Sequence, residues 1–162
     1  GDYMNPTLKD GDDVLINKQN LTIQQANDIL QKVEGDLLYI KAVFTSNDDK
    51  EFGIRLKSDG NRNMTSFTYS TKEGKIFGNT KNKGSVASTN NVSGELSLKN
   101  SKLTMEIYID RSLVEAFFND TKSISMRSYA AYDAQKVELF ADGDVVLDDL
   151  YIAKMKSIYS EK

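Results

Sequence analysis

The sequence predicts an all-β chain that folds as an antiparallel β-sandwich, with one short helix near the N-terminus. Apolar and polar residues alternate along many short segments, and this period of two places the apolar side chains on one face of a strand. The segments recur about every dozen residues between clusters of Asp, Asn, Gly and Ser, a spacing typical of sandwiches. The only proline, Pro6, lies outside all of these segments, as hydrogen bonding between strands prefers.

Size and composition indicate a single globular domain. The 162 residues suit one domain with a sizeable core, and 39% hydrophobic with 28% charged residues is a globular composition. No apolar run approaches the roughly 20 residues that cross a bilayer, so no membrane segment is expected. A net charge of −3 with scattered lysines offers no basic face, which excludes nucleic acid as an expected partner.

The chain contains no cysteine and no histidine. Their absence rules out disulfides, thiol nucleophiles, Cys/His zinc sites and any triad that depends on histidine. General acid–base chemistry would therefore have to come from Asp, Glu, Tyr or Lys.

We expect residues 1–21 to be irregular and residues 22–160 to form a single sandwich domain. A helix opens this domain. Thr22 followed by Gln25 fits a capping box, in which each side chain bonds the other residue's backbone N–H. The apolar stripe of this helix consists of Ile23, Ala26, Leu30 and Val33, and we expect the helix to end at Gly35.

Beyond the helix the period changes from helical to alternating. Short strands are expected around Leu38–Phe44, Phe52–Leu56, Thr65–Tyr69 and Ile76–Phe77, and later at Glu95–Lys99, Lys136–Ala141 and Val145–Met155. Residues 79–94 are rich in Asn, Lys, Ser and Gly, and we predict the longest loop there.

The central segment, residues 103–129, predicts three strands joined by two turns. Its first strand alternates strictly, with Leu103, Met105, Ile107 and Ile109 on one face. The turns follow at Asp110–Ser112 and Asn119–Asp120, where turn-forming residues interrupt the apolar run.

This segment also carries a resemblance. Ile109 to Asp120, IDRSLVEAFFND, followed by Ser123 to Tyr129, SISMRSY, resembles the signature of the C-terminal β-sandwich of family 32 glycoside hydrolases. The family comprises invertases, inulinases and levanases, which release fructose from sucrose and fructans. Weaker similarity extends from Gly35 to Ile152. The resemblance implies a lectin-like jelly roll of the concanavalin kind.

The catalytic part of that family does not match this chain. There, hydrolysis belongs to an N-terminal five-bladed propeller with the motifs Trp-Met-Asn-Asp-Pro-Asn, Arg-Asp-Pro and Glu-Cys. This chain has no tryptophan and no cysteine, and the faint echo at Tyr3-Met4-Asn5-Pro6 lacks the nucleophilic aspartate. We therefore predict that the fragment itself is not an enzyme.

Asp110 and Glu115 are the carboxylates that the hairpin could bring together, and two readings are open. Retaining glycosidases need two carboxyl groups about 5 Å apart, one of them with a raised pKa. Alternatively, Asp110 bonds its own turn, while Glu115 pairs with Arg111 or Arg127, since a buried glutamate usually has a bidentate arginine partner.

Sugar binding is a second hypothesis, which the resemblance admits because related sandwiches bind fructans. Glu51, Arg55 and Lys57 share the polar face of their strand and could line a groove. Aromatic rings for sugar C–H surfaces could come from Tyr69, Tyr129 and Tyr132. The alternative is a solvated sheet face with tyrosines at the edge of the core.

A calcium site is the least supported hypothesis. Asp142-Gly143-Asp144 lies near Asp148 and Asp149, and hard cations prefer several oxygen ligands. The spacing fails the calcium-loop pattern, and Asp-Gly between apolar runs is an ordinary hairpin signal. We predict neither a metal nor a cofactor.

The prediction is thus a catalytically silent C-terminal sandwich of a fructan- or sucrose-cleaving glycosidase, packed against the catalytic propeller of the same polypeptide. The alternative is a carbohydrate-binding module for levan or inulin, with a fructan or fructose as ligand. Expected ligand contacts are Glu51, Arg55, Tyr69, Asp110, Arg111, Glu115 and Arg127. A composition heavy in Lys, Asn and Asp suggests a bacterial source, and we expect the parent protein to be extracellular or at the cell surface.

Overall fold

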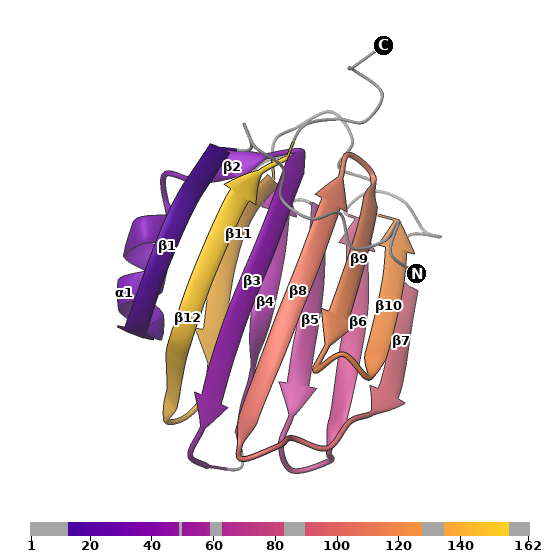
Figure 1. Ribbon diagram of the computed structural model, residues 1–162. Coiled ribbons are helices and arrows are strands. Elements are labelled where there is room, and N and C mark those ends of the chain that lie inside the picture. Colours follow the sequence, from indigo (N-terminus) through magenta and orange to yellow (C-terminus); the bar gives the residue numbers. More distant parts are fainter. Residues whose placement is uncertain (1–12, 49, 59–62, 83–89, 128–134, 156–162) are drawn as a thin grey trace.

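The computed structural model describes residues 13–48, 50–58, 63–82, 90–127 and 135–155. These residues form two six-stranded antiparallel sheets that pack face to face, with one short helix at one side (Figure 1). The predicted fold class, an antiparallel β-sandwich with a short helix, is confirmed.

The two sheets are called A and B. Sheet A contains, in order across the sheet, β1 (Asp13–Thr22), β12 (Val145–Lys154), β3 (Leu37–Ser46), β8 (Lys102–Asp110), β9 (Leu113–Phe118) and β10 (Lys122–Arg127). Sheet B contains β2 (Glu34–Gly35), β11 (Gln135–Ala141), β4 (Glu51–Ser58), β5 (Asn63–Ser70), β6 (Lys75–Asn82) and β7 (Asn90–Glu95).

The core lies between the sheets and follows the predicted alternation. Leu103, Met105, Ile107 and Ile109 are all fully buried, as the period of two predicts. Aromatic pairs join the sheets: the ring centroids of Phe44 and Phe52 are 5.0 Å apart, and those of Phe67 and Phe118 are 5.8 Å apart. Each pair takes one ring from sheet A and one from sheet B, so the sheets are fixed against each other by ring contacts.

The helix α1 (Ile23–Leu30) begins as predicted, but it ends before the predicted stop at Gly35, which belongs to β2. Thr22 accepts a hydrogen bond from the Gln25 backbone N–H, and the Gln25 side chain accepts one from the Thr22 backbone N–H, which completes the capping box. Ala26 and Leu30 face inward and are buried.

The helix also closes an edge of sheet B. β2 pairs with only two residues of β11, which leaves most of that strand's outer edge open. Asn27 fills the gap, because its side chain donates to the Leu139 carbonyl and accepts from the Leu139 N–H, both at 2.8 Å. A single amide thus takes the place of a neighbouring strand on an edge that would otherwise invite pairing.

We expect Asn27→Ala to lower the free energy of unfolding by about 2–3 kcal/mol, because both backbone groups of Leu139 lose their partner. Gln24→Ala is the matched control: Gln24 is an exposed residue of the same helix, and its loss should change stability by less than about 0.5 kcal/mol. Urea unfolding followed by circular dichroism measures both. Equal midpoints for the two variants would show that the amide does not hold the edge.

Three further predictions about local structure were wrong. Residues 13–21 were expected to be irregular, but they belong to β1, which pairs with β12 over its whole length. Residues 79–94 were expected to form one loop, but β6 continues to Asn82 and β7 begins at Asn90. The strand expected at Glu95–Lys99 ends at Glu95. In the first two cases pairing with a neighbouring strand overrides a polar composition, as it often does in sheets.

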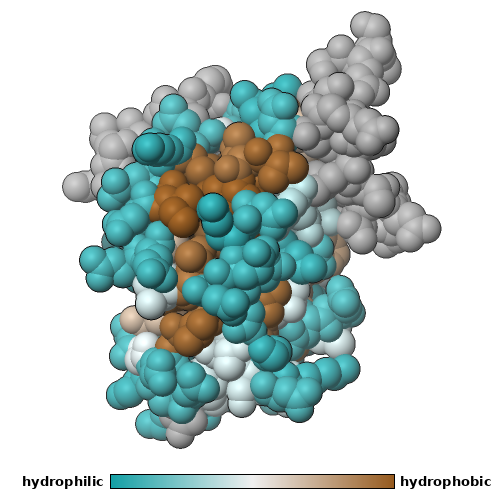
Figure 2. Space-filling model, turned by 60° about the vertical axis from the view of Figure 1, so that its left-hand side comes forward, coloured by the Kyte–Doolittle hydropathy of each residue, from teal (hydrophilic) through white to brown (hydrophobic). Residues whose placement is uncertain are grey.

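Figure 2 brings the α1 and β1 side forward and shows hydrophobic patches between hydrophilic side chains on this side. Val14 and Leu15 of β1 are the most exposed large hydrophobic residues of the described chain, at 54% and 43%. No helix in the described residues is long and apolar enough to span a membrane.

Candidate functional site

The predicted ligand residues fall on three separate parts of the molecule. Asp110, Arg111, Glu115 and Arg127 lie in or beside sheet A, Glu51 and Arg55 lie on sheet B, and Tyr69 points into the core. The outer faces of the two sheets point in opposite directions, so these seven residues do not form one site.

The corner hairpin is built around Arg111. Asp110 pairs with Leu113, which leaves Arg111 and Ser112 as a two-residue turn. Arg111 adopts a φ of 54°, a conformation that non-glycine residues rarely adopt. Its backbone N–H donates to the Asp36 carbonyl at 2.6 Å, and its guanidinium pairs with Asp110 at 3.2 Å. Both ionic groups are half-exposed, so this pair orients the turn more than it stabilises the fold.

The second turn, predicted at Asn119–Asp120, depends on hydrogen bonds of the Asn119 side chain that were not predicted. Asn119 has a φ of 49°, and its backbone N–H donates to the Thr104 carbonyl. Its side chain accepts from the Thr104 N–H at 2.7 Å and donates to the Lys102 carbonyl at 3.3 Å. The amide thereby extends the pairing beyond the end of β9. The tolerance of asparagine for a positive φ was the available signal.

The register separates the two carboxylates of the hairpin. Asp110 stands opposite Leu113 and Glu115 opposite Tyr108, so the two residues are diagonal neighbours on adjacent strands. Diagonal neighbours have Cα atoms about 7–8 Å apart, further than residues directly opposite each other. Asp110 bonds Arg111, which agrees with an architectural role for that residue.

The prediction that Glu115 pairs with an arginine was wrong. Within the described residues, no ion pair joins Glu115 to Arg111 or Arg127, and the Arg111 guanidinium goes to Asp110 instead. Glu115 is half-buried and lies beside Tyr108 and Ser125, its neighbours on the flanking strands. The reading in which an arginine pairs with Glu115 is therefore wrong, and Glu115 lies on the outer face of sheet A.

That outer face carries a continuous series of rings, here called the aromatic row: Tyr151, Tyr39, Tyr108 and Phe117. They come from the four adjacent strands β12, β3, β8 and β9. Successive ring centroids are 6.1, 4.9 and 5.8 Å apart. These are the distances at which aromatic pairs interact favourably in tilted or edge-on geometry.

A carboxylate is built into this row. The Tyr39 hydroxyl donates to a Glu106 carboxylate oxygen at 2.6 Å. Burial, this hydrogen bond and the charge of Glu106 all raise the pKa of Tyr39 above its ordinary value. Burial, with the charge of Glu106, likewise raises the pKa of Tyr108 to about 12. Both phenols therefore stay neutral at physiological pH.

The outer face of sheet B is polar and tied by ion pairs. The Glu138 carboxylate accepts from Arg55 at 2.9 Å and from Lys57 at 3.0 Å. The Arg55 guanidinium also stacks on the Phe140 ring, 3.9 Å from its centroid. The predicted polar face of this strand is confirmed, because Phe52, Ile54 and Leu56 on its other side are buried.

Burial alone would raise the pKa of Glu138, but the hydrogen bonds and charges of Lys57 and Arg55 outweigh it and hold the pKa below its ordinary value. A lowered native pKa gives stability that is present above the unfolded value of about 4.5 and is lost as pH falls through the native value. We expect Glu138→Gln to cost at most about 1 kcal/mol at pH 7, since the groups are partly exposed.

The gap in stability between wild type and Glu138→Gln should shrink as the pH is lowered from 6 towards 3, roughly the range in which carboxylates titrate. Urea titrations at several pH values measure it. A gap that is constant over this range would show that the carboxylate charge contributes nothing.

Tyr69 does not present a ring to solvent. It is 2% exposed, packs on Phe52, and donates its hydroxyl to the Leu96 carbonyl at 2.7 Å. Burial raises its pKa. Its position in the strand, two residues after the buried Phe67, was the signal for an inward side chain. Tyr129 and Tyr132, the other rings considered for sugar contact, lie outside the described residues.

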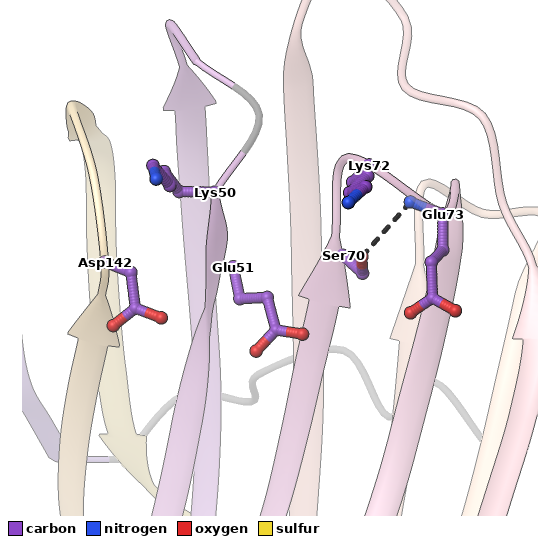
Figure 3. A pocket seen from close by; sticks show the side chains of 6 residues that line it. All are labelled: Lys50, Glu51, Ser70, Lys72, Glu73 and Asp142. Atoms are coloured by element: carbon purple, nitrogen blue, oxygen red, sulfur yellow. Dashed lines mark hydrogen bonds between the residues drawn. The ribbon is translucent and has the colours of Figure 1, made fainter.

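Glu51 lines a shallow pocket of about 380 Å³ at the end of sheet B, shown in Figure 3. The other residues that line it are Lys50, Ser70, Lys72, Glu73 and Asp142. The Ser70 hydroxyl accepts from the Glu73 N–H and orders the turn between β5 and β6. The lining is polar and offers no ring, so this depression lacks the stacking surface that a sugar site uses.

The acidic residues near the predicted hairpin at 142–144 serve local structure. Asp48 accepts from the Asp144 N–H at 2.8 Å, and Asp148 pairs with Lys102 and Thr45. Burial opposes ionisation of Asp148, but the bonds from Lys102 and Thr45 and the Lys102 charge lower its pKa overall. No group of three or more potential metal-binding residues occurs among the described residues.

A comparison with protein-family models matches residues 9–154 to the C-terminal region of glycosyl hydrolases family 32. The chain belongs to this family. The match covers the corner hairpin and both sheets, so the resemblance drawn from the segment Ile109 to Tyr129 is confirmed.

Similar proteins and solved structures include members of this family. A levanase of Bacillus subtilis (strain 168) is 28% identical over 151 residues, which is 87% of this chain but only 22% of the levanase. A fructofuranosidase of Schwanniomyces occidentalis, solved with fructosylnystose, superposes with a TM-score of 0.71 at 14% identity, over 94% of this chain and 36% of that one. The chain thus corresponds to a minor part of these enzymes.

A galectin of Caenorhabditis elegans, LEC-6, has a TM-score of 0.58 at 13% identity, over 84% of this chain and 94% of the galectin. At this identity the likeness shows the fold alone. The family 32 C-terminal domain therefore shares its sandwich architecture with a protein that consists of almost nothing else.

Proposed function

We propose that this chain is a non-catalytic domain that packs against the catalytic propeller of a β-fructosidase and supports it. The observation that carries the proposal is the match to the C-terminal region of family 32 over residues 9–154. Glycoside hydrolysis is then the activity of the parent polypeptide, and we place that parent outside the cell or at its surface.

The described residues support a silent role. Hydrolysis of glycosides needs two carboxyl groups that flank the scissile bond, one of them with a raised pKa. Glu138 and Asp148 have lowered pKa values and are held by cations, and Asp110 is bonded by Arg111. The pocket at Glu51 is polar and shallow and lacks an aromatic wall.

Two measurements test the proposal. The isolated chain should release no fructose from levan, inulin or sucrose. In the longer polypeptide that carries it, deletion of residues 9–154 should lower the melting temperature of the remaining catalytic part by several degrees. Fructose release by the isolated chain, or a deletion that leaves the melting temperature unchanged, would contradict the proposal.

A carbohydrate-binding module is the second candidate. The observation that favours it is the cluster on sheet B, where a guanidinium, a carboxylate and a ring lie together at Arg55, Glu138 and Phe140. Such groups bind sugar hydroxyls and C–H surfaces. Calorimetric titration with levan, inulin and fructose should give saturable heat that Arg55→Ala abolishes. The absence of heat with all three would exclude this candidate.

A further inference from the structure

Three apolar residues of sheet A are buried without belonging to the core. Tyr39, Tyr108 and Ala153 are only 8%, 9% and 0% exposed, yet they lie outside the cluster that fills the space between the sheets. In the register they form one line across three strands, because Ala153 pairs with Tyr39 and Tyr39 with Tyr108. The outer face of sheet A therefore has a packed apolar centre of its own.

Exposed apolar residues continue this centre in two directions. Val14 pairs with Ala153 and is 54% exposed, and Leu113, in the corner hairpin, is 42% exposed. Together with the half-buried end rings of the aromatic row, Tyr151 and Phe117, they expose an apolar band around the buried Tyr39 and Tyr108. Among the described residues, the corresponding face of sheet B carries instead the ion-paired Arg55, Lys57 and Glu138.

We propose that the aromatic row, with Val14 and Leu113 at its ends, is the surface on which the catalytic domain of the same polypeptide docks. This inference rests on the proposed function. Exposed apolar bands rimmed by polar groups mark protein interaction sites, and Tyr, Phe and Arg are enriched where such interfaces are buried.

The path of the chain favours the catalytic domain as the partner that docks on this face. The described chain begins with β1 in sheet A, where Asp13 pairs with Lys154 and the next residue, Val14, already belongs to the apolar band. A domain tethered upstream of residue 13 is therefore joined to the chain beside this apolar band. In the levanase, the matching region is 22% of the protein, so a much larger part of that relative lies outside it.

The charges of the face define what the docked surface must offer. Glu106 accepts a hydrogen bond from Tyr39, while Glu115, beside the row, makes no ion pair among the described residues. A buried carboxylate needs a donor, and arginine is the usual one. The complementary surface should thus carry apolar side chains against the rings and an arginine, lysine or backbone N–H against Glu115.

The test uses the longer polypeptide with a protease site inserted just before residue 9. After cleavage, the two parts should still co-elute from a sizing column. Phe117→Lys places a charge in the aromatic row and should weaken the association at least tenfold. Phe77→Lys is the matched control, because Phe77 is a half-buried ring on the outer face of sheet B, and it should leave the association unchanged.

The outcomes separate the inference from the proposed function. Co-elution of the wild type and of both variants would overturn the docking surface but leave packing against the catalytic domain intact. Separation of the wild-type parts would overturn the proposed function itself.

Hydroxyl-radical footprinting on the unsubstituted polypeptide does not depend on how a variant folds. We expect Tyr151 and Leu113 to be oxidised at least threefold more slowly in the joined polypeptide than in the isolated chain, with Phe140 unchanged. Protection of Phe140 alone would place the contact on sheet B and overturn the inference.

Discussion

Gly53→Ala should prevent stable folding of the isolated chain. A Cβ atom at this position would lie 1.9 Å from the Phe67 carbonyl oxygen and 3.0 Å from the carbonyl carbon of Phe67 and the Cα of Thr68. All three are backbone atoms of β5, which pairs with β4 from Glu51 to Ser58. Relief would require the two central strands to move apart, and their hydrogen bonds would be lost.

We expect a loss of about 4 kcal/mol or more, beyond the usual range for overpacking, because backbone cannot move aside as a side chain can. Domains of this size are stable by only about 5–15 kcal/mol, so the variant should be largely unfolded in mild denaturant. Circular dichroism during urea unfolding measures this.

Gly94→Ala is the control for the loss of glycine itself. A Cβ there would meet only the end of the Lys122 side chain, at 3.2 Å, and that flexible chain can turn away. Its stability should change by less than about 0.5 kcal/mol. Similar midpoints for the two variants would show that β4 and β5 can separate at Gly53 at little cost.

Phe118→Ala should have the second-largest effect. Phe118 is fully buried and its ring meets Phe67 of the other sheet, so truncation leaves a cavity where the sheets join. Removal of a buried phenylalanine ring costs about 3–5 kcal/mol. The loss should appear as a lower urea midpoint with an unchanged slope, since the surface exposed on unfolding hardly changes.

Phe117→Ala is the internal comparison, because the adjacent ring points to the outer face and is only half-buried. We expect a loss of about 1 kcal/mol in the isolated chain. A one-residue slip of the strand would exchange the two side chains between faces. The ratio of the two effects therefore reports the register of β9, and a larger effect at Phe117 would refute the pairing.

The aromatic row could be predicted only in part. Each of its members lies between two core residues of its own strand; Tyr39, for example, stands between Leu38 and Ile40, and Tyr108 between Ile107 and Ile109. Parity places these rings on an outer face. It does not show that they touch, because β3 and β8 are neighbours through long-range pairing.

The ligand residues were predicted from composition and resemblance, and their placement shows the limit of that approach. Arg55 was placed correctly on a polar face, but its partner, Glu138, lies 83 residues further along the chain. Glu115 was given Arg111 or Arg127 as its partner, but it stands opposite Ser125, and neither arginine forms an ion pair with it among the described residues. Charge pairs across strands depend on register, which no local pattern contains.

The sequence by itself determined the sandwich class, the helix start at Thr22, the inward faces of strands such as β8 and the turn at Arg111. These features depend on periods and turn residues within a few positions of each other. Only the tertiary structure decided that Asn27 pairs with Leu139, that polar residues 13–21 form a strand, and that four distant rings make one surface. Such features arise from strand order, where the energy of pairing and burial outweighs local preference.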